Sequence, residues 1–134
     1  MVEVELSKII IDEKRQDQII VLKEKKGDRQ FPIVIGFLEA SSIKMRLAAI
    51  KTPRPMTHDL MVNAIKELGG KVQSLIIDKM VNSTFHAKLE IKTGSDQKML
   101  DCRPSDGVAI AVRVKVPIFV DEEVLKKTAI FKSN

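Results

Sequence analysis

The chain has 134 residues, which suits one domain with a single core and is too short for two. Its 23 basic and 18 acidic residues give a net charge of +5, which permits a nucleic-acid partner but is mild. It shows neither an apolar run of membrane-spanning length nor a signal-peptide pattern, so we expect a cytoplasmic protein without a membrane partner.

The N-terminal part of the chain predicts three strands. Apolar and polar residues alternate over residues 2–11, as in a strand that is buried on one face. Two further strands are expected over 19–25 and 30–35, joined by a turn in an antiparallel meander. Pro32 cannot donate a backbone hydrogen bond, so the third strand should lie at an edge of the sheet or contain a bulge.

The middle of the chain predicts two helices separated by a proline-rich loop. The first, over residues 36–51, places its apolar core stripe at helical spacing, at Ala40, Ile43, Leu47 and Ile50. The second should begin with Thr57 as its N-cap and end at the Gly69–Gly70 pair. Its apolar residues are Leu60, Met61, Ala64, Ile65 and Leu68.

The C-terminal half completes the predicted fold. Four strands are expected, over 72–81, 84–93, 97–102 and 117–120. A buried helix should begin at Pro104, and a last helix should follow Asp121 as its cap. We therefore predict an α+β fold in one domain, residues 1–127, with mostly antiparallel sheet of about six to seven strands, three to four helices, and a loose tail over 128–134.

Two segments, 54–59 and 103–106, share one local plan at a helix start. Each has an arginine and a proline, then a hydroxyl side chain, then an aspartate. Free N–H groups at a helix N-terminus, with an arginine beside them, suit a phosphate oxyanion. We expect both helix starts to lie in one neighbourhood. The predicted phosphate-binding residues are Arg54, Thr57, Arg103 and Ser105.

The same helix starts carry the candidate catalytic residues His58, Asp59 and Asp106. A surface-accessible His58 could act as general base or acid, because histidine titrates near neutral pH. Asp59, Asp106 and Glu39 could hold a divalent metal, Mg²⁺ or Mn²⁺, which takes a few carboxylates together with water and substrate phosphate. The alternative is structural, because aspartates at helix starts are normal caps and form ion pairs with arginine.

A basic cluster on the first helix and the loop after it is a candidate nucleic-acid surface. It consists of Lys44, Arg46 and Lys51, next to Arg54, and the one acidic residue nearby is Glu39. The chain has no Trp or Tyr, so aromatic platforms for base stacking are poorly supplied. Contacts to nucleic acid should therefore be made mainly to phosphates.

Two further expectations concern association and source. An exposed strand edge over residues 30–35 predicts a homodimer or a larger homo-oligomer. Charged residues make up 31% of the chain, and with many Lys and Ile and few Asn and Gln this composition is typical of thermophilic proteins.

Several blocks of sequence, in order, resemble the bifunctional nuclease (BFN) domain family. They are 31–36 (FPIVIG) with 39–40 (EA), 54–60 (RPMTHDL), 84–87 (TFHA), 101–106 (DCRPSD) with Ala109, Ala111 and Arg113, and 117–120 (PIFV). The resemblance covers about residues 2–125. It implies an α+β domain that hydrolyses phosphodiester bonds of DNA and RNA with the help of a metal.

Two other functions fit the same residues. One is a non-catalytic binding module that takes an anionic ligand or a partner protein at the paired helix starts. The other is a structural oligomeric protein. A nuclease needs at least two carboxylates with free lone pairs converging in an open cleft, whereas a binding module can use arginines and backbone N–H groups.

Overall fold

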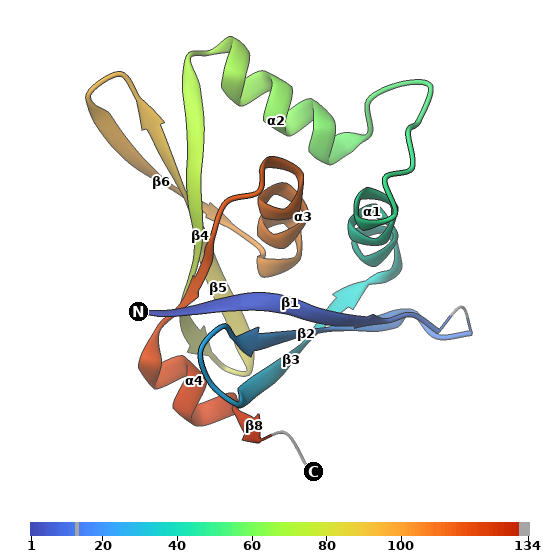
Figure 1. Cartoon of the computed structure of the whole chain (residues 1–134), viewed down its shortest axis with the longest axis vertical. Helices are drawn as coiled ribbons and strands as arrows, with labels where there is room; N and C mark the ends of the chain where they lie inside the picture. The colour runs from blue at the N-terminus through green and yellow to red at the C-terminus, as the bar shows by residue number, and fades with distance from the viewer. Residues whose placement is uncertain (13, 132–134) are drawn as a thin grey trace.

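The computed structural model describes residues 1–12 and 14–131 and shows one curled sheet with helices packed against it (Figure 1). Its strands are β1 (Val2–Ile10), β2 (Asp17–Glu24), β3 (Arg29–Gly36), β4 (Gly70–Val81), β5 (Thr84–Thr93), β6 (Asp96–Cys102), β7 (Ile118–Val120) and β8 (Ile130–Phe131). Its helices are α1 (Phe37–Leu47), α2 (Thr57–Glu67), α3 (Pro104–Val114) and α4 (Glu122–Thr128). The predicted α+β class is confirmed, and the two-residue β8 is an additional strand.

Two antiparallel meanders make up the sheet, and β7 joins them. The strand order is β6-β5-β4-β7-β1-β2-β3-β8. β7 pairs antiparallel with β1 and parallel with β4, where Leu75 lies opposite Ile118. The parallel pair arises because α3 carries the chain from β6 back to the far side of β4.

The sheet curls so strongly that strands far apart in its order meet. Phe31 of β3 and Phe85 of β5 have four strands between them, yet their ring centroids lie 5.7 Å apart. Such a contact requires the sheet to wrap around its own core, which follows from the right-handed twist of successive strands. The wrapping brings the end of β3 close to the start of α3.

Helix α3 lies at the centre of the helical layer. It packs against α1, α2, β4 and β5, as its position in Figure 1 shows, while α4 packs against β3 and β4. Val108, Ala109 and Ile110 are almost completely buried, which explains the apolar sequence of this helix. Gly107 permits the close approach to β4, because a Cβ atom at this position would collide with the side chain of Leu75.

Both predicted core stripes of α1 and α2 were too wide. α1 ends at Leu47, and the chain turns at Ala49, whose φ is 54°. Leu47 and Ile50 are therefore exposed. α2 lies at the margin of the fold, so Leu60, Met61 and Leu68 are exposed too, although Val62 and Ile65 pack against the core. Periodicity identified the helices but could not show how little of each one the sheet covers.

The edge of the sheet at β3 is partly covered by the C-terminal tail. β8 pairs with Arg29 and Gln30, and no strand in the described part of the chain pairs with the outer edge of β3 beyond them. The oligomer expected from this edge stays a prediction. Of the tail expected to be loose, Thr128 ends α4 and Ile130–Phe131 form β8, whereas residues 132–134 lie outside the described residues. No described helix is both long and apolar enough to cross a membrane.

Candidate functional site

The start of α3 presents a partly exposed ion pair. Arg103 is the N-cap residue and Pro104 begins the helix, as predicted. The Asp106 side chain bonds to Arg103, whose Nε donates to Asp106 Oδ2 at 2.9 Å. Arg103 Nη2 also donates to Glu39 Oε1 of α1 at 3.2 Å. The Arg103 side chain remains 66% exposed, so much of its guanidinium faces solvent.

His58, in the first turn of α2, connects this ion pair to the interior. Its Nε2 lies 2.9 Å from Asp106 Oδ1, and its Nδ1 lies 2.8 Å from the hydroxyl of Ser42 on α1. His58 was expected to be surface-accessible, but it is only 8% exposed. One imidazole ring thus joins three helices, and both of its nitrogens are already engaged.

The network determines which nitrogen of a neutral His58 carries the hydrogen. Arg113 Nη2 donates to Ser42 Oγ at 2.9 Å, and a guanidinium can only donate. The Ser42 hydroxyl can therefore give its own hydrogen to His58 Nδ1. A carboxylate such as Asp106 can only accept, so the hydrogen of the neutral ring is on Nε2 and is donated to Asp106 Oδ1, which leaves Nδ1 to accept from Ser42.

A second arginine–aspartate pair lies deeper, between α2 and α3. Arg113 is only 6% exposed, and its Nε donates to Asp59 Oδ1 at 2.9 Å while its Nη1 donates to the Ala109 carbonyl at 3.0 Å. The other oxygen of Asp59 accepts from the backbone N–H of Met56 at 2.9 Å. Asp59 thus stabilises the start of α2, and Met56, not the predicted Thr57, is the N-cap residue.

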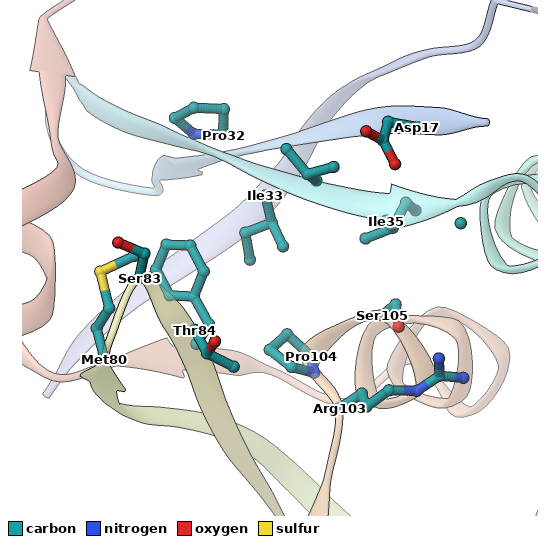
Figure 2. Close-up of a pocket in the computed structure, with 13 residues that line it drawn as sticks. Asp17, Pro32, Ile33, Ile35, Met80, Ser83, Thr84, Arg103, Pro104 and Ser105 are labelled. Carbon is teal, nitrogen blue, oxygen red and sulfur yellow. The ribbon is translucent and has the colours of Figure 1, made fainter. Parts of the chain in front are cut away.

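Two hollows flank Arg103. A pocket of about 290 Å³ between α1 and the starts of α2 and α3 is lined by Leu38, Met56, Thr57, His58, Arg103 and Asp106, among others. A groove of about 560 Å³ lies on the other side, between the start of α3, β3 and the β4–β5 turn. Figure 2 shows Ser105 at the start of α3, next to Pro104, where it lines this groove. Ser105 therefore lines a different hollow from His58.

Comparison with known proteins agrees with the resemblance of the sequence blocks. The model of the bifunctional nuclease domain matches residues 20–133 of this chain, most of its length. The chain belongs to the bifunctional nuclease domain family.

Relatives of this BFN domain occur in bacteria and plants. An uncharacterized protein of Mycobacterium tuberculosis (strain ATCC 25618 / H37Rv) is 37% identical over 97% of this chain and 77% of its own length. Bifunctional nuclease 1 of Oryza sativa subsp. japonica is 36% identical over 78% of this chain, and bifunctional nuclease 1 of Arabidopsis thaliana is 27% identical over 77% of it. The match spans 33% of the length of each of these two plant proteins.

Hydrogen bonds keep both aspartates of the BFN network ionised. Burial opposes the charge on Asp106, but hydrogen bonds from Arg103 and His58 outweigh it and hold its pKa below the usual value. The backbone N–H of Met56, followed by Arg113, lowers the pKa of Asp59 although burial opposes this shift. Asp106 in turn raises the pKa of Arg103. At neutral pH the pocket therefore holds an ionised carboxylate beside an exposed cation.

The lowered pKa of Asp59 predicts an acid-sensitive fold. A carboxylate whose pKa is lower in the folded state stabilises the protein above its unfolded pKa of about 3.9, and loses this effect as the pH falls through the folded value. We expect the melting temperature to be nearly constant from pH 7 to about 5 and to fall below about pH 4. The difference between wild type and Asp59→Asn should shrink over the same range, and a constant difference down to pH 2 would contradict the assignment.

The three predicted metal ligands do not fit a shared cation. In residues 1–12 and 14–131, no group of three His, Cys, Asp or Glu side chains has the geometry of a metal site. Both oxygens of Asp59 and of Asp106 accept hydrogen bonds from the protein, and Glu39 accepts one from Arg103. Among the described residues, a chain of hydrogen bonds through Arg113, Ser42 and His58 in succession links Asp59 to Asp106.

The structure divides the other predicted residues between two places. Thr57 lines the His58 pocket, as Glu39 does. Arg54 lies instead on a separate hollow of about 340 Å³, together with Arg46 and Lys51. Lys44 is exposed on α1. The two Arg-Pro turns therefore do not present their arginines to one pocket, although His58 and Asp106 do meet.

Reasoning from the sequence missed the roles of Ser42 and Arg113. Arg113 offered a usable signal, because it ends an otherwise apolar, buried helix and a buried guanidinium needs partners. Ser42 offered none, since a single serine in a predicted helix does not show which side chain its hydroxyl meets. Its importance follows only from the packing of α1 against α2 and α3.

Proposed function

We propose that this BFN domain binds a phosphodiester of DNA or RNA in the His58 pocket and hydrolyses it there. The observation that carries the proposal is the exposed Arg103 guanidinium beside the ionised Asp106, at the N-terminus of α3. Membership of the bifunctional nuclease domain family supports hydrolysis as the outcome.

In this proposal the accessible groups act on the substrate and the buried ones position them. Arg103 binds a non-bridging phosphate oxygen and offsets the charge that develops as water attacks phosphorus. Each carboxylate oxygen has more than one lone pair, so Asp106 can also accept a hydrogen bond from that water and take its proton as the new P–O bond forms. The P–O bond to one sugar oxygen then breaks, and this oxygen leaves with a proton from the solvent that reaches the open pocket. His58 donates to Asp106 and fixes its orientation. Both ring nitrogens are engaged by protein groups, so His58 positions Asp106 and does not itself contact the substrate.

One observation favours a second function, a binding module for polyanions that does not cleave. The oxygens of Asp59 and Asp106 are all engaged by protein donors, and no described group of three metal-ligating side chains converges at the pocket. Arginines and helix N-termini alone are sufficient to hold a phosphate. Binding without cleavage would identify this function.

A cleavage assay separates the two functions. Purified protein is incubated with end-labelled DNA and RNA in Mg²⁺, in Mn²⁺ or in EDTA, and product length is measured. We expect both polymers to be shortened, and Arg103→Gln to slow cleavage at least tenfold, on the order expected for one phosphate-binding group. Lys127→Gln, an exposed charge on α4, is the control. Intact polymers under every metal condition would overturn hydrolysis, whereas activity in EDTA would show that no metal is needed.

A further inference from the structure

A second hollow, the cationic pocket, lies beside the His58 pocket and takes no part in the proposed chemistry. It has a volume of about 340 Å³ and lies between the end of α1, the loop over residues 48–56, and α2. Its charged lining consists of Arg46, Lys51, Arg54, Arg113 and Asp59.

The cationic pocket has more positive side chains than the carboxylates around it can pair with. Arg46, Lys51 and Arg54 form no ion pair with any residue in the described ranges. Asp59 is the one carboxylate in the lining, and it is already paired with the buried Arg113. Three cations are therefore left for an anionic ligand from solution.

The loop backbone and Arg46 of this pocket are held in place before any ligand arrives. Pro53 and Pro55 restrict the loop, and the Thr52 hydroxyl donates to the Arg54 carbonyl at 2.6 Å. Arg46 Nη2 donates to the Arg113 carbonyl at 3.2 Å, which ties the rim to the end of α3. Binding of a ligand therefore costs less conformational entropy than it would on a fully flexible loop.

The cationic pocket and the His58 pocket are neighbours. Met56 lines both of them, and the chain of bonds from Asp59 through Arg113 and Ser42 to His58 runs beneath. Neither pocket has a Phe in its lining, and the chain has no Trp or Tyr. A ligand that spans both pockets would be held by its phosphates and not by stacking of its bases.

We propose that the cationic pocket is a second phosphate site, which holds a phosphate next to the one at Arg103 on the same strand. This inference rests on the proposed function and specifies its substrate class. The ligand is a nucleic acid strand of several nucleotides, bound through its backbone and without base sequence readout. Such recognition would allow one site to accept both DNA and RNA, because neither pocket needs to contact the 2′-hydroxyl.

The test compares two triple variants of the full chain with the same change in net charge. One is Arg46→Gln/Lys51→Gln/Arg54→Gln. The control is Lys79→Gln/Lys92→Gln/Lys127→Gln, which removes exposed lysines elsewhere that form no ion pair with a described residue. Binding is measured by fluorescence anisotropy at several salt concentrations in EDTA. The ligands are labelled 12-nucleotide DNA and RNA strands of mixed sequence and a labelled dinucleotide with a single phosphate. Circular dichroism verifies that each variant is folded.

For the 12-nucleotide strands, we expect the first variant to bind at least tenfold more weakly. Its salt dependence should also be lower by roughly 0.7 in log–log slope, the value for one lost phosphate contact on a single strand. The control should keep most of the wild-type affinity, and dinucleotide binding should be the same in all three proteins. Equal weakening by both triple variants, or unchanged binding in the first, would overturn the second phosphate site. Tight strand binding that depends on the cationic pocket, but without cleavage when Mg²⁺ is added, would support this site and overturn only hydrolysis.

Discussion

Asp106→Asn is expected to slow cleavage of DNA and RNA on the order of 100-fold or more while leaving the melting temperature nearly unchanged. Asn keeps the shape of the side chain and can still accept the hydrogen bond from His58 Nε2, but it loses the charge that faces the substrate water and Arg103. The stability cost is small because the Arg103 side chain is 66% exposed, and water can solvate the cation that loses its partner.

The measurement is cleavage rate and thermal unfolding on the same preparation. Asp101→Asn is the matched control, since Asp101 lies on the neighbouring strand β6, is exposed, and makes no ion pair with a described residue. Full activity with a large loss of stability would show that Asp106 is a structural residue and not a catalytic one. Strand binding by the wild type without any cleavage would overturn the catalytic role of Asp106 and favour the binding module.

Asp59→Asn should have the opposite profile, with a large loss of stability. This substitution leaves Arg113, which is only 6% exposed, without its negative partner. Removing one member of a buried ion pair commonly costs about 3–5 kcal/mol, and because Asp59 itself is 37% exposed we expect about 2–3 kcal/mol here. The melting temperature should then fall by roughly 10 °C.

A double variant shows whether the stranded charge is the cause. Asp59→Asn/Arg113→Met removes both charges and should recover part of the stability lost in Asp59→Asn, because an apolar side chain needs no partner in the interior. Chemical denaturation of the wild type, each single variant and the double variant gives the coupling energy. If the double variant loses as much stability as the two single variants together, or more, the ion pair is not the main contribution of Asp59.

The different roles expected for the two aspartates follow from the burial of their arginine partners. Both occupy the first turn of a helix and both have an arginine partner, so the local sequence around them is alike. Asp106 meets an arginine that faces solvent, whereas Asp59 meets one inside the protein. Chemistry is therefore expected at the first position and architecture at the second.

The sequence by itself determined the fold class, the order of the elements, and the helix start at Arg103–Pro104. These features depend on short-range physics, since periodicity, turn residues and proline act within a few positions along the chain. The resemblance of five sequence blocks also identified the family, which the match over residues 20–133 confirmed.

Tertiary structure alone decided which side chains meet. The bonds from His58 to Ser42 and Asp106 span 16 and 48 positions, and those from Arg113 to Asp59 and Ser42 span 54 and 71. Such partners depend on how α1, α2 and α3 pack, and similar local motifs place Arg54 and Arg103 on different hollows. Local rules describe what a helix start can bind, but only the packing of three helices determines which neighbour reaches it.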